Sequence, residues 1–241
     1  MDQNPWASVP PSQSPMYTTP NRTMEPVGVY TAKAFGWMFV GLLVTFLVAV
    51  FGYVTGLIFY VFSVPYLPFI LLAAELLVVI VLSARIHKLS VGAATALFFL
   101  YAILNGVVFT VYFVLFSVPS LMLVFAVTAA FFGIMALYGY FTKNDLTRLR
   151  PLLIGGLLFL IAFGLLSFFL PLGKFERLYC LIGIAIFMAF TAYDVQKIRK
   201  YYLAFQFQPE MAQKATIISA LELYLDFINI FLYLLRFLKH K

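Results

Sequence analysis

Seven long apolar segments separated by short polar connections constrain the fold of this 241-residue chain more than any other feature. One crossing of a bilayer needs about 20 consecutive apolar residues. The seven runs cover about 34–62, 67–84, 91–116, 119–141, 152–171, 178–196 and 216–238. Composition agrees, because 64% of the residues are hydrophobic and only 10% are charged, against about 45–50% and about 25% in soluble domains. The pattern predicts an all-α membrane protein with seven transmembrane helices.

The N-terminal segment differs from the rest of the chain. Six of the twelve prolines lie in the first 26 residues, among Ser, Thr, Asn and Gln. We expect residues 1–30 to be a disordered tail and residues 31–241 to be the seven-helix transmembrane domain. The tail lacks the layout of a cleavable signal peptide, so the first span is expected to stay.

Basic residues predict the orientation of the spans. With the tail in the cytoplasm, the cytoplasmic segments hold Arg22, Lys33, Arg85, Lys88, Lys143, Arg148, Arg150, Lys197, Arg199, Lys200 and Lys214. The opposite side holds Lys174, Arg177, Arg236, Lys239 and Lys241. This excess predicts a cytoplasmic N-terminus. The net charge of +7 is therefore assigned to loops that orient the spans, and no nucleic-acid partner is expected. An alternative is that the last run enters the membrane and returns, which would place the C-terminal basic residues in the cytoplasm; seven full crossings are favoured by its length.

The last run carries acids in an otherwise apolar helix. Glu222 and Asp226 lie four residues apart, and Asn229 and Tyr233 continue the stripe at helical spacing. A charge inside a bilayer is costly and almost always faces a bundle interior or a water-filled path. We therefore expect this stripe to point inward, with the other spans wrapped around the last helix.

Two further acids lie within spans. Glu75 is near the middle of the second run, which ends at Arg85, and Asp194 is close to the end of the sixth run. Because the sixth and seventh spans are joined by a short connection, Asp194 and Asp226 are expected on neighbouring helices. Two carboxyl groups in a low dielectric tend to share a proton and titrate as one pair, and a nearby Arg85 would favour their charged forms. The result would be a proton-sensitive latch.

Each acid also has a plainer interpretation. Asp194 could pair with Lys197 three residues later, at a solvated helix end. Glu222 could be a second acid of the same path or a residue near the membrane surface. Glu75 could be a neutral, hydrogen-bonded acid that serves only packing.

Four segments of this chain together resemble the Bax inhibitor (transmembrane BAX inhibitor motif) family, and in particular its bacterial members. They are YTAKAFGWMFVGLL from Tyr30, VTAAFFGIMALYGYFTKNDLTRLRPLL from Val127 to Leu153, TAYDVQKI around Asp194 and ALELYLDFINIFLYLLRF around Asp226. The resemblance covers nearly the whole chain from about Tyr30. Its most specific parts are the Tyr138–Leu146 segment and the two aspartate motifs in order.

The resemblance implies a seven-helix fold with the last helix central, and a pH-sensitive calcium leak across the membrane. It implies that Asp194 and Asp226 form the gating dyad and that Arg85 is the latch that closes it. Glu75, Glu222 and Asn229 are then candidates to line the ion path, although the family has a small or polar residue where Glu222 stands. Calcium would be the permeant ion, in weak and transient contact with Asp194 and Asp226, because calcium prefers six to eight oxygen ligands and the spans offer few acids.

The expected setting is a multi-pass protein of the bacterial inner membrane that has no cofactor and is not an enzyme. Its partners would be the bilayer, calcium ions and protons. A non-conducting regulator that binds a membrane protein, such as a quality-control protease or a cell-death factor, is one alternative. A proton-coupled cation exchanger is another, although matching broken helices are not seen. An intramembrane aspartyl protease also uses one aspartate from each of two spans, but its Gly-x-Gly-Asp motif is absent at Asp226.

Overall fold

The computed structural model describes residues 25–167 and 169–239, so the predicted tail lies largely outside the described residues. Regular structure in the described part is helical throughout. The α-helices are α1 (Val27–Val54), α2 (Leu57–Ser63), α3 (Leu67–Arg85), α4 (Val91–Leu115), α5 (Val118–Phe141), α6 (Arg150–Leu166), α7 (Glu176–Phe205) and α8 (Pro209–Lys239). Short 3-10 helices, η1 (Leu146–Leu149) and η2 (Leu172–Phe175), precede α6 and α7. In this described part, seven segments are long and apolar enough to cross a membrane. The prediction of seven spans is confirmed.

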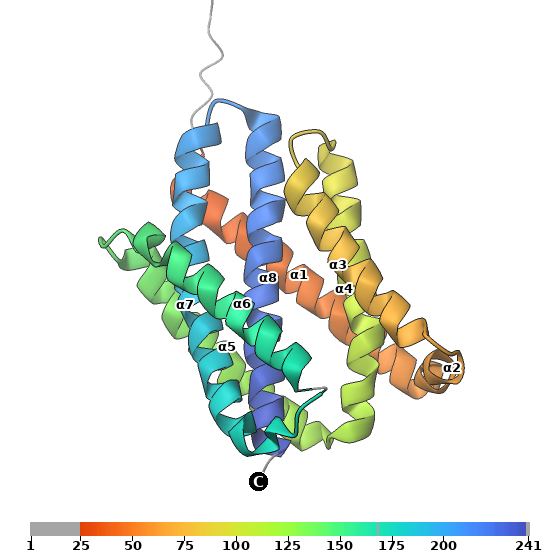
Figure 1. The fold of residues 1–241 in the computed structure, drawn as a ribbon. Coiled ribbons are helices and arrows are strands. Elements are labelled where there is room, and N and C mark those ends of the chain that lie inside the picture. Colours follow the sequence, from red (N-terminus) through yellow and green to blue (C-terminus); the bar gives the residue numbers. More distant parts are fainter. Residues whose placement is uncertain (1–24, 168, 240–241) are drawn as a thin grey trace, which may run out of the picture.

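Helix α8 is the centre of the bundle. It contacts α1, α4, α5 and α7, and it runs through the middle of the molecule in Figure 1. Of its most apolar stretch, 72% is buried, against 50% for α7 and 39% or less for the other spans. The helix continues unbroken to the end of the bundle opposite the start of α1 and does not turn back. The predicted central position of the last helix and its full crossing are both confirmed.

Three helix boundaries differ from the sequence prediction. The first apolar run is divided between α1 and α2, because Gly56 adopts a left-handed backbone conformation with φ of 71°. Helix α1 begins at Val27, so its first four residues fall within the range predicted as a tail. Tyr30 explains this early start, since its side chain is buried and its hydroxyl donates to Ala212 O at 3.0 Å. Helix α7 extends nine residues beyond the predicted run, to Phe205.

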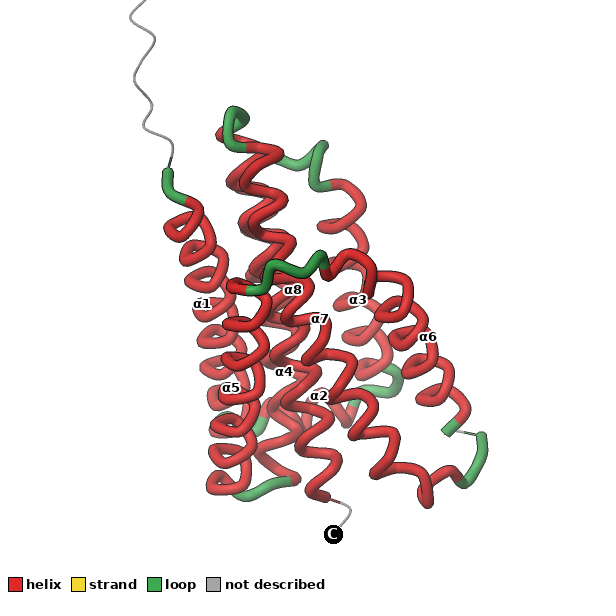
Figure 2. The backbone as a smooth tube through the Cα atoms, turned by 90° about the vertical axis from the view of Figure 1, so that its left-hand side faces the viewer, coloured by secondary structure: helices red, strands yellow, loops and turns green. Residues whose placement is uncertain are grey.

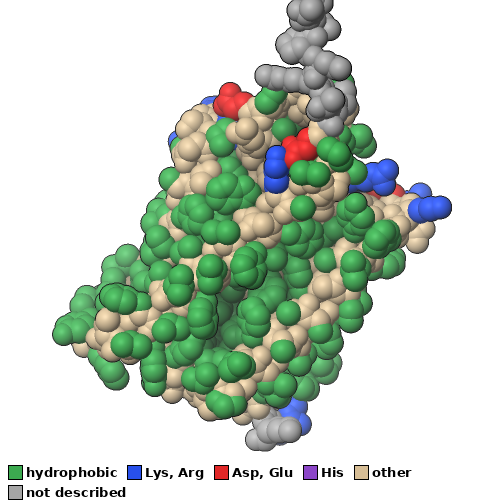
Figure 3. All heavy atoms as spheres, turned by 180° about the vertical axis from the view of Figure 1, so that it is seen from behind, with side chains coloured by type: hydrophobic (Ala, Val, Ile, Leu, Met, Phe, Trp, Pro, Cys, Tyr) green, Lys and Arg blue, Asp and Glu red, His purple; other side chains and the backbone are tan. Residues whose placement is uncertain are grey.

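The outer surface of the bundle is apolar. Figure 3 shows hydrophobic side chains over most of the visible face, with charged side chains gathered toward its two ends. Large exposed hydrophobic residues come from many helices, among them Phe39, Phe59, Phe69, Met122, Ile134 and Leu158. In water so large an apolar surface would drive association, whereas lipid chains are as apolar as these side chains. The described surface is therefore that of a membrane protein.

Helices α5 and α7 approach closely at Gly139. A Cβ at this position would overlap the backbone of Ala192, two residues before Asp194. Only glycine allows this separation, since small residues let helix backbones come into contact. The contact places α5 directly against the part of α7 that carries the acidic residue.

Candidate functional site

Four charged residues from α7 and α8 meet inside the bundle and form what we call the acid cluster: Asp194, Lys197, Glu222 and Asp226. Lys197 Nζ lies 2.6 Å from Glu222 Oε1 and 3.7 Å from Asp194 Oδ1. The spacing along each helix explains the grouping, because residues three or four apart share a helix face. Asp194 and Lys197 on α7 therefore face Glu222 and Asp226 on α8.

The acid cluster is poorly solvated. Asp194 is 7% exposed and Asp226 only 3%, while the side chains of Lys197 and Glu222 are about a quarter exposed. Within the described residues, Asp226 Oδ2 and Glu222 Oε2 are buried without a hydrogen-bond partner. Asp226 also lies within electrostatic range of the other three members.

The charges of the acid cluster do not balance. Three carboxyl groups face a single ammonium group, so full ionisation would leave two uncompensated negative charges. Unpaired charges in a low dielectric are costly, and bound protons or a cation can remove that cost. The arrangement is therefore able to bind protons and to attract cations.

The structure brings some of the predicted site residues together and leaves another apart. Asp194, Asp226 and Glu222 all belong to the acid cluster. Arg85 is exposed at the end of α3 and makes no ion pair in the described part of the chain. The cation that contacts the acids is Lys197, which sequence reasoning considered only as a surface partner of Asp194. The sequence feature that could have identified Lys197 is its three-residue spacing from Asp194. The role of Arg85 as a latch stays a prediction.

Glu75 lies in a second polar region, on the other side of α8. It is 9% exposed, and its Oε1 atom has no hydrogen-bond partner among the residues described. Tyr101 and Tyr224 are within electrostatic range of it. The Tyr224 hydroxyl is 2.6 Å from Thr45 Oγ1. Tyr224 and Asp226 point to different faces of α8, so this helix separates Glu75 from the acid cluster.

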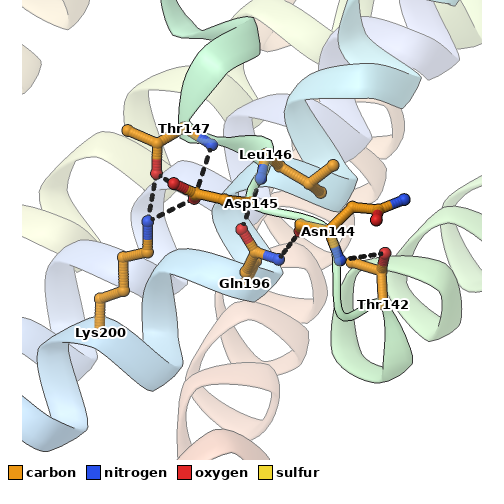
Figure 4. A network of polar contacts seen from close by, with 7 residues as sticks. All are labelled: Thr142, Asn144, Asp145, Leu146, Thr147, Gln196 and Lys200. Carbon is orange, nitrogen blue, oxygen red and sulfur yellow. Dashed lines mark hydrogen bonds and ion pairs between the residues drawn. The ribbon is translucent and has the colours of Figure 1, made fainter.

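Polar contacts join the loop between α5 and α6 to Gln196 and Lys200 of α7 (Figure 4). Gln196 Oε1 accepts from Leu146 N at 2.9 Å, and Gln196 Nε2 donates to Asn144 O at 2.7 Å. Lys200 Nζ donates to Asp145 Oδ1 at 2.9 Å and also contacts Thr147. Hydrogen bonds from Thr147 and Lys200 hold the pKa of Asp145 below its usual range.

These contacts join two of the motifs singled out in the sequence. Asn144, Asp145 and Leu146 end the Tyr138–Leu146 segment, and Gln196 lies in the motif around Asp194. Gln196 precedes Lys197, whose side chain enters the acid cluster. The two Gln196 contacts thus hold the loop against the turn of α7 that supplies the only cation of the cluster.

The fold and the acid cluster define a class: a polytopic helical membrane protein whose acidic last helix is surrounded by four of the other spans, α1, α4, α5 and α7. Comparison with known proteins identifies the family within this class. Residues 28–241 match the sequence profile of the family described as "Inhibitor of apoptosis-promoting Bax1". The chain thus belongs to the Bax inhibitor family, as the resemblance predicted.

Bacterial relatives match along most of their length. The chain is 39% identical over 209 residues to the inner membrane protein YbhL of Escherichia coli, covering 86% of this chain and 89% of YbhL. It is 39% identical over 218 residues to a protein of Borreliella burgdorferi, covering 88% and 92% of the two chains. A protein of Deinococcus radiodurans is 36% identical over 222 residues, with 90% and 93% covered.

Proposed function

We propose that this protein is a pH-sensitive calcium leak channel of the bacterial inner membrane, with its N-terminus in the cytoplasm. The observation that carries the proposal is the acid cluster, in which three carboxyl groups and one lysine lie between the two most buried helices. Ionisable groups placed inside a membrane are typical of ion and proton pathways. The name of YbhL supports the inner membrane as the location.

Asp194 and Asp226 are the gating pair in this proposal. Lys197 joins α7 to α8 by contacting Asp194 and Glu222, so it stabilises the closed arrangement. A change in the protonation of the carboxyl groups alters their attraction to Lys197 and lets the two helices separate. Protons and calcium ions also compete for the same oxygen atoms, so the flux depends on pH.

The permeant ion is expected to make only transient contacts with Asp194 and Asp226. Calcium favours six to eight oxygen ligands. The described residues contain no group of three or more His, Cys, Asp or Glu side chains arranged to hold a metal. A hydrated ion that passes the acids fits this donor set better than a tightly bound one. The bilayer, calcium and protons are the only partners that the proposal requires, and it involves no cofactor and no catalysis.

The test is calcium uptake into liposomes that contain the purified protein, measured from about pH 5 to pH 8. Asp226→Asn and Lys197→Met are expected to change both the flux and its pH dependence. Lys200→Met is the matched control, since this lysine lies one turn further along α7 and contacts the loop instead of the acid cluster. Arg85→Ala tests the predicted latch in the same assay. A flux that keeps its pH response in Asp226→Asn would refute gating by this pair.

Absence of flux at every pH in folded wild-type protein would refute the channel. The alternative hypothesis, a non-conducting regulator, would then be tested by a search for a membrane-protein partner.

A further inference from the structure

A cavity of about 550 Å³ opens beside α8 near the end where this helix terminates. Its walls include Tyr112 from α4, Phe116 directly after α4, Glu176 from α7, and Asn229, Tyr233 and Arg236 from α8. Asn229, Tyr233 and Arg236 extend the stripe that begins at Glu222 and Asp226. Three residues of helix rise by about 4.5 Å, so the wall at Asn229 is less than one turn from Asp226.

Two polar contacts tie α7 to α8 along one wall of this cavity. Glu176 and Arg236 form an ion pair. One turn deeper, the Tyr179 and Tyr233 hydroxyls are 3.1 Å apart. The Tyr179 hydroxyl also donates to Leu160 O at 2.9 Å, and the Arg236 guanidinium lies 5.2 Å from the centre of the Tyr179 ring. We call these two contacts the α7–α8 tie.

The position of the α7–α8 tie suggests what it controls. Both contacts lie on the cavity side of Asn229, whereas Asp226 lies on the inner side and is almost completely buried. Widening the cavity toward Asp226 requires α7 and α8 to separate at this end. The two contacts oppose that separation, and hydrogen bonds to charged groups are among the stronger ones.

On the basis of the function proposed above, we infer that this cavity is the water-filled entrance to the acid cluster from the side where α8 ends. The α7–α8 tie closes the entrance between Asn229 and Asp226. A hydrated cation then waits in the cavity and reaches Asp226 only when Arg236 releases Glu176. The bundle would thus have a second point of control, separate from Lys197.

Cysteine labelling tests the entrance without any measurement of flux. The single native cysteine, Cys180, is buried and can be replaced in a Cys180→Ala background. Asn229→Cys, Asp226→Cys and Ile230→Cys are then made singly in this background, and the proteins are treated in nanodiscs with a cationic, membrane-impermeant thiol reagent. Asn229→Cys should react, and Ile230→Cys, whose parent residue is fully buried, should not. Labelling after denaturation confirms that each cysteine is present.

The tie is tested at the deeper position. Asp226→Cys should react slowly, and Arg236→Gln should speed its labelling by roughly tenfold, the shift expected from the loss of about 1.4 kcal/mol. Arg236→Lys should keep the slow rate. Lys239→Gln, which removes a positive charge from the same cavity without touching the tie, should leave the rate unchanged.

The inference would be overturned if Asp226→Cys were labelled as fast with Arg236 present as in the Arg236→Gln variant. It would also be overturned if Asn229→Cys did not react. An equal acceleration by Lys239→Gln would overturn it as well, because it would show an effect of charge alone. The liposome assay distinguishes failure of the proposed channel from failure of this inference. If the cysteines are labelled as expected but the protein shows no calcium flux, the leak is refuted and the entrance is not.

Discussion

Lys197→Met is the most informative single change, because it removes the only cation of the acid cluster and keeps a side chain of similar length. Glu222 Oε1, 2.6 Å from Lys197 Nζ, and Asp194 would both lose their positive partner. Removing one member of a buried ion pair costs about 3–5 kcal/mol. The Lys197 and Glu222 side chains are 23% and 25% exposed, so we expect a loss near the lower limit, about 3 kcal/mol of unfolding free energy.

The loss should depend on pH with a definite sign. Ionised carboxylates are the costly species once Lys197 is gone, and a proton can neutralise them. The destabilisation is therefore expected to be larger at pH 8 than at pH 5. Combining Lys197→Met with Glu222→Gln should be less damaging than the sum of the single changes, by about 2 kcal/mol, since residues in direct contact are coupled.

The measurement is reversible unfolding in detergent for the wild type, both single variants and the double variant at the two pH values. Lys200→Met is the control on the same helix, where both partners of the ion pair are more than half exposed and little effect is expected. Additive losses in the double variant, or a loss that is equal at both pH values, would show that Lys197 does not compensate the buried acids.

Three further predictions concern other parts of the bundle. Gly139→Ala should lower stability by about 1–3 kcal/mol through overlap with the Ala192 backbone, whereas Gly133→Ala on the same helix, with open space around it, should be neutral or slightly stabilising in the same unfolding assay. Because the pKa of Asp145 is lowered, this group stays ionised from about pH 5 to 8, and its contribution to stability is lost only at lower pH. Asp145→Asn should therefore speed hydrogen exchange in the α5–α6 loop equally at pH 5 and at pH 8. Arg85→Ala should leave unfolding unchanged, since its side chain is exposed, and a large loss would reveal a contact made in another state.

Sequence periodicity and hydrophobicity were sufficient for the architecture. A bilayer requires about 20 apolar residues per span and helices that satisfy their own backbone hydrogen bonds, so seven apolar runs predict seven helices. The cost of burying Glu222 and Asp226 predicts that the last helix turns this face inward. Four segments taken together, among them Tyr138–Leu146 and the motifs around Asp194 and Asp226, were also sufficient to predict the family, which the comparison confirmed.

Tertiary structure decided which groups meet. Sequence spacing describes neighbours on one helix, but the pairing of Lys197 with Glu222 depends on the rotation of α7 against α8, which side-chain packing sets. The same is true of Gln196, whose contacts with the α5–α6 loop join residues about fifty positions apart. Acidic residues in an apolar helix therefore show in the sequence that an interior polar site exists, whereas the identity of its cation follows only from the packing of one helix on another.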